Sequence, residues 1–246
     1  MRRVHHLILI PALALAAALP AAAVTSSAPV ELHDRIALDG NADRRIALTL
    51  DACGGGYDAE LIDFLILHRI PATVFATRRW IERNPVGLAV LKSHADLFGI
   101  EDHGEHHRAA VIGAGRRIYG IPGVADVGQL RSEVTGGADA IEQAFGTRPR
   151  WYRGATAEYD PQAASEIRRM GFRIAGFSVN ADAGATLSAN SVSARVRRAQ
   201  PGDVILAHMN KPSSDTNEGL RPALLELRAR GLQFVRLDDV ELSSLP

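Results

Sequence analysis

The chain has 246 residues, 46% of them hydrophobic, and its 28 lysines and arginines balance 28 aspartates and glutamates. This balance of charge gives no indication of binding to nucleic acid or to a charged membrane surface. Cys53 is the only cysteine, so an internal disulfide is excluded, and the chain must rely on a hydrophobic core, which its length allows within one domain.

The N-terminus has the composition of a secretory signal peptide. Arg2 and Arg3 form a basic start, an apolar stretch follows, and three consecutive alanines end at position 23. The apolar stretch is shorter than the roughly 20 residues that span a bilayer, although a retained anchor is the alternative. We therefore expect residues 1–23 to be removed on export. The mature protein would be periplasmic or secreted, with no stable membrane insertion.

Residues 24–43 are expected to form a linker or N-terminal extension, followed by a single catalytic domain at 44–246. Within this domain short apolar runs alternate with helical patterns, which is typical of βαβ units and a mostly parallel sheet. In chain order we expect a strand at 44–51, a helix at 59–69, a strand at 71–77, a helix at 80–94, a strand at 96–103, a helix at 126–146, a strand at 149–154, a helix at 161–170, a strand at 171–182, a helix at 191–199, a strand at 202–209, a helix at 218–230 and a strand at 233–237.

Seven strands with right-handed connections fit a distorted (β/α) barrel with fewer than eight strands, or a doubly wound sheet. Both architectures gather active-site residues at the C-terminal ends of the strands. Polar residues stand at or just after five of these strand ends. Each alone could be a helix cap or a core residue, but together they indicate an active site. They are Asp51, His103, Arg153, Asp182 and His208.

The stretch "EDHGEHH" at 101–107 is the sharpest local signal. His103 and His107 are four residues apart, which would let two neutral imidazoles face one divalent ion, and His106 stands beside them. Gly104 does not fit the zincin motif, and a zinc deaminase would need a pair of cysteines that this chain lacks. A solvated histidine-rich loop is the alternative to a metal site.

In their order and spacing, these residues resemble the five motifs of the polysaccharide deacetylases, the NodB-homology carbohydrate esterases. The resemblance covers about residues 45–210, most of the expected mature chain. It implies an α/β fold, a NodB-like distorted (β/α) barrel with about seven parallel strands. The matching stretches are "LTLDACGG", "HGEHH", "WYRGATAEYD", "FSVNADAGA" and "GDVILAH".

The resemblance implies a metal-dependent hydrolase that removes N-acetyl or O-acetyl groups from sugars of a polysaccharide or peptidoglycan substrate. The cofactor would be a divalent metal ion, with zinc as the first choice, held by His103 and His107 and a third ligand. By matching position, Asp51 would be the base and His208 the acid. Arg153 would hold the carboxylate of Asp51, and Asp182 would orient His208 and raise its pKa.

The chain departs from the family pattern at the third metal ligand. Ala52 stands where the family has a second aspartate, and the two prolines of the third motif are absent. Either Asp51 becomes the ligand and another group acts as base, or Asp58 reaches into the site. A helix N-cap is the alternative role for Asp58. Cys53 could bind zinc as a thiolate, although a small buried residue is the interpretation we favour from the sequence.

Four further residues are expected to contact substrate, and core packing or plain exposure is the alternative for each. Two other functions stay open. A carbohydrate-binding protein on the same fold would have lost catalysis with the change at Ala52. A glycosidase would use two carboxylates such as Asp51 and Asp182, which leaves the histidines unexplained. The expected substrate-binding residues are Tyr152, Asn180, Asn210 and Lys211.

Overall fold

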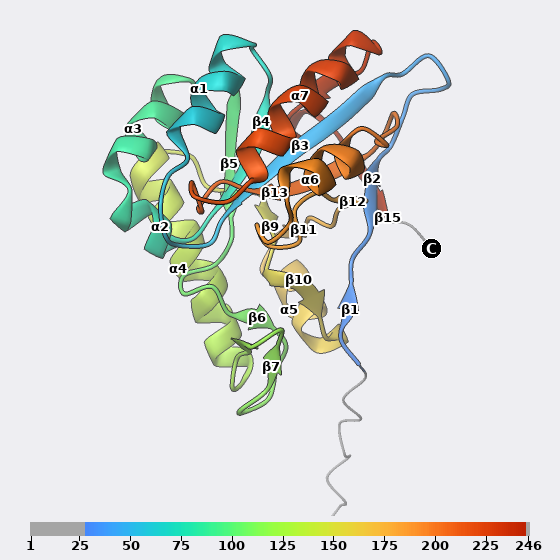
Figure 1. Ribbon diagram of the computed structural model, residues 1–246. Helices are drawn as coiled ribbons and strands as arrows, with labels where there is room; N and C mark the ends of the chain where they lie inside the picture. Colours follow the sequence, from blue (N-terminus) through green and yellow to red (C-terminus); the bar gives the residue numbers. More distant parts are fainter. Residues whose placement is uncertain (1–27, 245–246) are drawn as a thin grey trace, which may run out of the picture.

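The computed structural model describes residues 28–244, and the expected signal peptide at 1–23 lies outside these residues (Figure 1). No helix in the described part of the chain is both long enough and apolar enough to cross a bilayer. A curled parallel sheet forms the centre of the molecule, and helices cover its outer face.

Strand β3 (Arg45–Ala52) is the longest strand of the sheet, and all of its residues except Arg45 are buried, as expected for a strand inside a covered parallel sheet. One edge of β3 pairs with β13. Its other edge pairs with β14 near the start of the strand and with β4 near its end. Every pairing in this sheet is parallel. The strand order is β11-β9-β5-β4-β3-β13-β12, with β14 on β3: β4 (Ala72–Ala76), β5 (Phe98–Asp102), β9 (Trp151–Tyr152), β11 (Arg173–Ile174), β12 (Val179–Asn180), β13 (Val204–His208) and β14 (Gln233–Val235).

The segment predicted as one strand at 171–182 divides into β11 and β12, so the seven predicted strands become an 8-stranded sheet. Strand β11 pairs with β9 and β12 pairs with β13, at opposite ends of the strand order. The residues between them therefore link the two edges and curl the sheet into an incomplete barrel. The prediction of a distorted α/β barrel with about seven parallel strands is confirmed.

The helices lie close to their predicted positions, with one division. The predicted helix at 80–94 ends early at Arg83 and restarts at Pro85, because proline cannot donate the backbone hydrogen bond that would continue it. Figure 1 shows α1, α3, α6 and α7 on the outer face of the sheet. The helices are α1 (Ala59–Leu67), α2 (Arg78–Arg83), α3 (Pro85–Ser93), α4 (Val127–Phe145), α5 (Pro161–Arg169), α6 (Ala189–Val196) and α7 (Thr216–Ala229).

The alternation of side chains along β3 separates the core from the site. Successive residues of a strand point to opposite faces, so Leu48, Leu50 and Ala52 join the main core between sheet and helices. Thr49 and Asp51 point the other way, toward the inside of the barrel, where Arg153 contacts both. This one strand thus both anchors the core and carries a buried carboxylate to the C-terminal edge.

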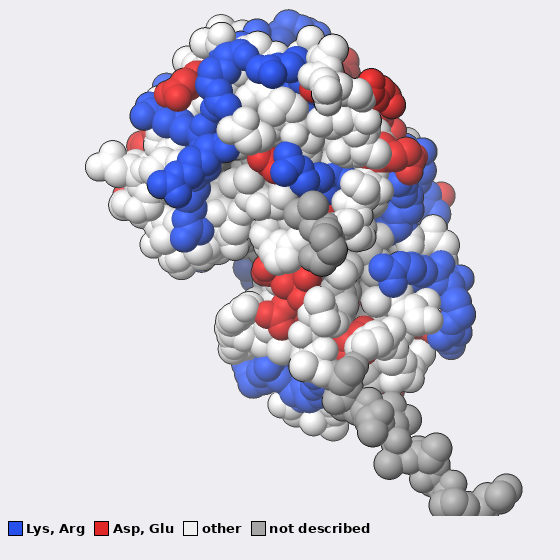
Figure 2. Space-filling model, turned by 90° about the vertical axis from the view of Figure 1, so that its right-hand side faces the viewer, with Lys and Arg blue, Asp and Glu red and all other residues white. Residues whose placement is uncertain are grey.

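The extension expected at 24–43 forms strands in its described part. Strand β1 (Val30–Glu31) pairs with β10 (Ala155–Tyr159), and β2 (Asp34–Ile36) pairs with β15 (Leu242–Ser244). Seen from the side in Figure 2, the molecule has a narrow waist with acidic side chains, and basic side chains lie above and below it. The remaining short elements are β6 (Ala109–Ala110), β7 (Arg117–Ile118), β8 (Ile121–Pro122) and a 3-10 turn at Leu237–Asp239.

Candidate active site

A cavity of about 550 Å³ opens at the C-terminal edge of the sheet. Four of its lining residues come from the predicted catalytic and metal-binding set, and three come from the predicted substrate-binding set. Segments far apart in the sequence therefore meet there, as expected where parallel strands end. These lining residues are Asp51, His103, His107 and His208, and Asn180, Asn210 and Lys211.

Asp51 is a buried carboxylate that is paired with a buried guanidinium. Nη1 of Arg153 lies 3.0 Å from Oδ1 of Asp51 and also donates to Oγ1 of Thr49 at 2.8 Å. The rest of the guanidinium donates to the backbone oxygens of Ala175 and Gly176. Burial raises the pKa of Asp51, but the charge of Arg153 offsets this, so the pKa lies below its usual value. The carboxylate is therefore ionised and fixed in position.

His208 forms a second pair, with Asp182. Nδ1 of His208 lies 2.9 Å from Oδ1 of Asp182, and Oγ1 of Thr216 donates to the other carboxylate oxygen at 3.0 Å. Burial lowers the pKa of His208, but the hydrogen bond to Asp182 raises it well above its usual value. The pair therefore favours the protonated form of the ring, and His208 lines the cavity.

His103, His107 and Cys53 bring three possible metal ligands together, with their donor atoms all within 4.8 Å of one another. Nδ1 of His103 lies 2.6 Å from the backbone oxygen of Arg153, which fixes the ring and turns Nε2 toward the cavity. Nε2 lies 3.5 Å from Sγ of Cys53 and 3.8 Å from Oδ2 of Asp51. One thiol and two imidazoles are a donor set that suits zinc.

The charges at this cluster favour a thiolate. Burial raises the pKa of the Cys53 thiol, but the neighbouring imidazoles, above all that of His103, lower it by more, well below its usual value. Burial lowers the pKa of His103, but Asp51 and Cys53 raise it to about 9. Without a metal ion, the two shifts favour a thiolate on Cys53 and a proton on His103, and a bound metal ion would displace that proton.

Helix α4 holds the histidine loop from behind. Oε1 of Glu133, a buried side chain, accepts hydrogen bonds from the backbone nitrogens of His106 and Arg108 at 2.9 and 3.0 Å. Gly137 lets the helix approach closely, because a Cβ there would lie 2.0 Å from Oδ1 of Asp102. His107 has a φ of +61°, a left-handed conformation that few residues other than glycine adopt. The contacts with α4 therefore stabilise a strained backbone conformation in the histidine loop.

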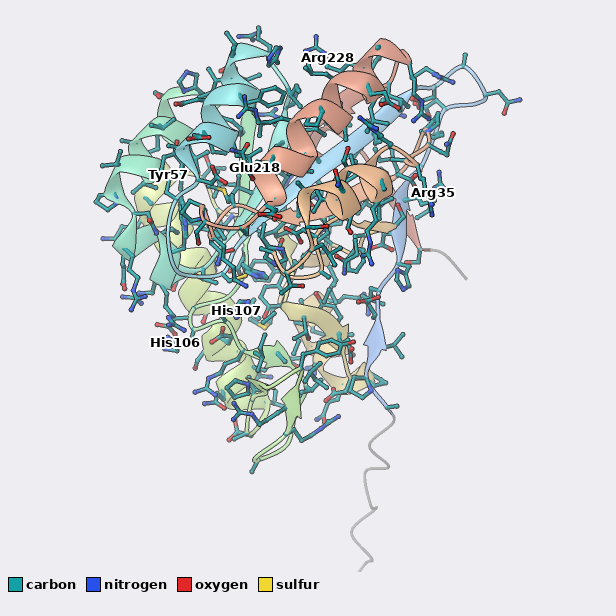
Figure 3. The ribbon with its side chains drawn as sticks, viewed as in Figure 1. Arg35, Tyr57, His106, His107, Glu218 and Arg228 are labelled. Atoms are coloured by element: carbon teal, nitrogen blue, oxygen red, sulfur yellow. The ribbon has the colours of Figure 1, made fainter. Side chains whose placement is uncertain are left out.

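The loop separates its histidines. His103 and His107 line the cavity, with ring centroids 5.0 Å apart. The side chain of His106 is 57% exposed and lies near Glu105. Figure 3 labels His106 and His107 in this loop. The structure thus brings together the two histidines that the spacing singled out and leaves the third at the surface.

Two predicted site residues lie elsewhere. Asp58 does not line the cavity, because its carboxylate accepts a hydrogen bond from the backbone nitrogen of Leu61 and caps α1. Tyr152 is fully buried in a hydrophobic cluster and does not line the cavity. The geometry gives Asp58 its alternative role as an N-cap and gives Tyr152 a role in the core.

Several lining residues were not predicted from the sequence. Glu31 comes from β1, Tyr119 comes from the turn between β7 and β8, and Phe177 comes from the link between β11 and β12. Tyr119 is 79% exposed, as a residue at the rim would be. Tyr119 stands in the glycine-rich loop that follows the histidines, and this position could have indicated a site residue. No local sequence pattern indicated Glu31.

The comparisons with known proteins agree with this geometry. The sequence profile of the polysaccharide deacetylase family matches residues 39–175. The peptidoglycan-N-acetylmuramic acid deacetylase PdaA of Bacillus subtilis (strain 168) is 25% identical over 219 residues, which are 86% of this chain and 76% of that protein.

Solved structures share the fold. The structure of PdaA from B. subtilis superimposes with a TM-score of 0.65 at 21% identity, over 82% of each chain. A family 4 carbohydrate esterase pseudoenzyme from Bacillus anthracis gives a TM-score of 0.66 at 18% identity, over 82% of this chain and 66% of that one. The chain belongs to the polysaccharide deacetylase family, whose enzymes hydrolyse the carbon–nitrogen bond of acetylated sugars.

Proposed function

We propose that this protein is a metal-dependent deacetylase that removes the N-acetyl group from an amino sugar of peptidoglycan or a related polysaccharide. One observation carries the proposal. An ionised carboxylate, Asp51, and a protonated imidazole, His208, line the same cavity as two further imidazoles that could hold a metal ion. A protein that only binds carbohydrate has no need of such a combination.

The metal would be held by His103 and His107 together with a third donor. A divalent ion there would polarise the acetyl carbonyl and lower the pKa of a water molecule. The proposal does not need Asp58, because that carboxylate is committed to the N-terminus of α1.

Asp51 is suited to accept a proton from the attacking water. A base must be ionised, and Arg153 keeps the pKa of Asp51 low despite its burial. Oδ1 is occupied by Arg153, whereas Oδ2 lies near Nε2 of His103, on the side of the cavity. The arrangement therefore leaves one carboxylate oxygen for the proton transfer.

His208 is suited to protonate the leaving nitrogen of the sugar. An amine is a poor leaving group unless it receives a proton as the carbon–nitrogen bond breaks. Asp182 keeps His208 protonated near neutral pH and fixes the ring with Nδ1 turned away from the cavity. Nε2 is then the atom that would give up the proton.

The rim of the cavity is suited to a sugar chain. Tyr119 offers an exposed aromatic face, Asn180 offers an amide, and Lys211 offers an ammonium group. Peptidoglycan, the polymer in the name of the B. subtilis relative, lies outside the cytoplasmic membrane. This location agrees with the export that we predict from residues 1–23.

Acetate release tests the proposal. Purified protein is incubated with peptidoglycan and with N-acetylated oligosaccharides, and acetate is measured for the wild type, Asp51→Asn and His106→Ala. We expect release by the wild type, release by His106→Ala because that ring is exposed, and a loss of at least about 100-fold in Asp51→Asn. Binding of glycan without acetate from any of these substrates would instead favour a silent protein like the B. anthracis pseudoenzyme.

A further inference from the structure

We propose that the thiolate of Cys53 is the third protein ligand of the metal ion, in the role that the sequence leaves vacant at Ala52. The inference rests on the metal site of the proposed function. It is independent of whether the protein releases acetate, because it concerns which atoms hold the ion.

The direction of the chain at the end of β3 turns Cys53 toward the cavity. Ala52 is the last residue of the strand, and it is fully buried in the main core between sheet and helices. Since strand residues alternate between faces, position 53 returns to the side of Asp51, and Cys53 lines the cavity. A donor at this point of the chain is therefore available from residue 53 and not from residue 52.

The distances match those of a zinc site. Zinc binds thiolate sulfur at about 2.3 Å and imidazole nitrogen at about 2.0–2.1 Å, so two such ligands at a tetrahedral angle lie about 3.5 Å apart. Sγ of Cys53 lies 3.5 Å from Nε2 of His103. The donor atom of His107 lies within 4.8 Å of both, so one ion between the three residues could contact all of them.

The backbone around Cys53 is fixed by neighbours on both sides. Oγ1 of Thr77 donates to the backbone oxygen of Cys53 at 2.8 Å. Nδ2 of Asn210 donates to the backbone oxygen of Gly54 at 2.7 Å, and the backbone oxygen of Asn210 accepts from the backbone nitrogen of Gly56 at 2.9 Å. These contacts hold the thiol in place without any contribution from a metal, as a preformed site requires.

Other candidates for the third ligand are less suitable. Asp58 caps α1, and Asp51 is bound through Oδ1 to the buried guanidinium of Arg153. With Cys53 as a ligand, Asp51 keeps its free oxygen for proton transfer. Three protein ligands also leave one coordination position open to the cavity, which is the usual arrangement of catalytic zinc.

A thiolate ligand makes a specific prediction about the metal. Soft sulfur favours zinc and related transition metals, whereas magnesium, calcium and manganese prefer oxygen ligands. We therefore expect the protein to bind zinc or cobalt, and to select against magnesium and manganese more strongly than a site with a carboxylate in place of Cys53 would.

Cobalt(II) substitution tests the ligand directly. Because Cys53 is the only cysteine, a thiolate-to-cobalt charge-transfer band in the near ultraviolet has a single source. We expect this band in the wild type and in His106→Ala, and its loss in Cys53→Ser and Cys53→Ala, with zinc affinity weakened at least about tenfold in both cysteine variants. X-ray absorption of the zinc-loaded wild type should show one sulfur at about 2.3 Å.

The outcomes separate this inference from the proposed function. A zinc shell of nitrogen and oxygen only, or a cobalt spectrum that is the same in Cys53→Ser and the wild type, would overturn the role of Cys53, whether or not acetate is released. A sulfur signal in a protein that releases no acetate would support the ligand and overturn the deacetylase. The X-ray absorption experiment uses the wild type, so it tests the sulfur ligand even if a cysteine variant fails to fold.

Discussion

The carboxylate of Asp182 accepts two hydrogen bonds from His208, one from the backbone nitrogen at 2.8 Å and one from ring Nδ1 at 2.9 Å. The first bond fixes the end of β13, and the second sets the orientation of the ring. Asp182 has no exposed surface, and its carboxylate also accepts a hydrogen bond from the hydroxyl of Thr216. The Asp182–His208 pair is therefore held rigidly. A rigid pair of this kind predicts a specific dependence of activity on pH.

Asp182→Asn should shift the alkaline limit of activity to lower pH. In the wild type the anion raises the pKa of His208 above its usual 6.5, so the proton needed by the leaving group is present at neutral pH. Without the charge of Asp182, the largest of the influences that oppose burial is lost, so the pKa of His208 falls. We expect acetate release at pH 8 to fall by about 10- to 100-fold, and to fall less at pH 6. Thr216→Val keeps the charge and is the matched control, and an unchanged profile in Asp182→Asn would exclude this role.

Arg153→Met should strongly destabilise the fold. The substitution leaves the Asp51 carboxylate buried without its partner, which costs about 3–5 kcal/mol in the free energy of unfolding. Arg69→Met removes an exposed ion pair with Asp96, which water screens, and should leave the free energy of unfolding almost unchanged. Urea unfolding measures both. Equal losses in the free energy of unfolding in the two variants would show that the buried Arg153–Asp51 pair stabilises the fold no more than an exposed pair does.

Two adjacent glycines of α4 should respond differently to replacement by alanine. A Cβ at Gly137 would lie 2.7 and 2.8 Å from the backbone C and O of Gly104, so Gly137→Ala must displace the histidine loop. A Cβ at Gly136 meets the side chain of Glu105, which can move. Alanine stabilises a helix by up to about 1 kcal/mol relative to glycine, and this gain applies equally to both positions.

We therefore expect Gly137→Ala to lower both the midpoint of unfolding and the affinity for zinc, and Gly136→Ala to leave zinc affinity unchanged. Thermal unfolding and a zinc titration measure the two effects. Similar zinc affinities in the two variants would contradict the idea that α4 positions the loop.

Glu101 should make the fold less stable as pH rises. Its carboxylate is buried, and burial together with the neighbouring Asp238 raises its pKa to about 9. Between its unfolded pKa of 4.5 and this value the native state holds a proton that the unfolded state has lost, so stability falls by at most about 1.4 kcal/mol per pH unit. Glu101→Gln cannot ionise, and its urea midpoint should therefore decline less between pH 5 and 9. Parallel pH profiles for the two proteins would contradict this assignment.

The sequence predicts the strands, and it also predicts which edge of the sheet holds the site. Buried parallel strands are continuous apolar runs, and their polar terminators must meet because parallel strands end on one side. Asp51, His103 and His208 were predicted to meet on this basis, and all three line the cavity. The alternation of faces then decides which neighbouring residue points inward.

The remaining features depend on geometry that short segments do not encode. Position 53 lies one residue beyond the end of β3, so the strand pattern alone could not show that its thiol comes close to His103 and His107. Strand β9 is two residues long, so periodicity could not place Tyr152 in the core. Strand β1, which brings Glu31 to the cavity, is recognisable only by its pairing with β10, more than a hundred residues later.

Removal and return of the metal test the central claim most directly. The wild type is stripped with a chelator, dialysed, and titrated with zinc while acetate release from N-acetylated glycan is followed. We predict no release from the stripped protein, and full recovery at about one zinc per chain. Equal acetate release with and without zinc, at a metal content near zero, would contradict the account.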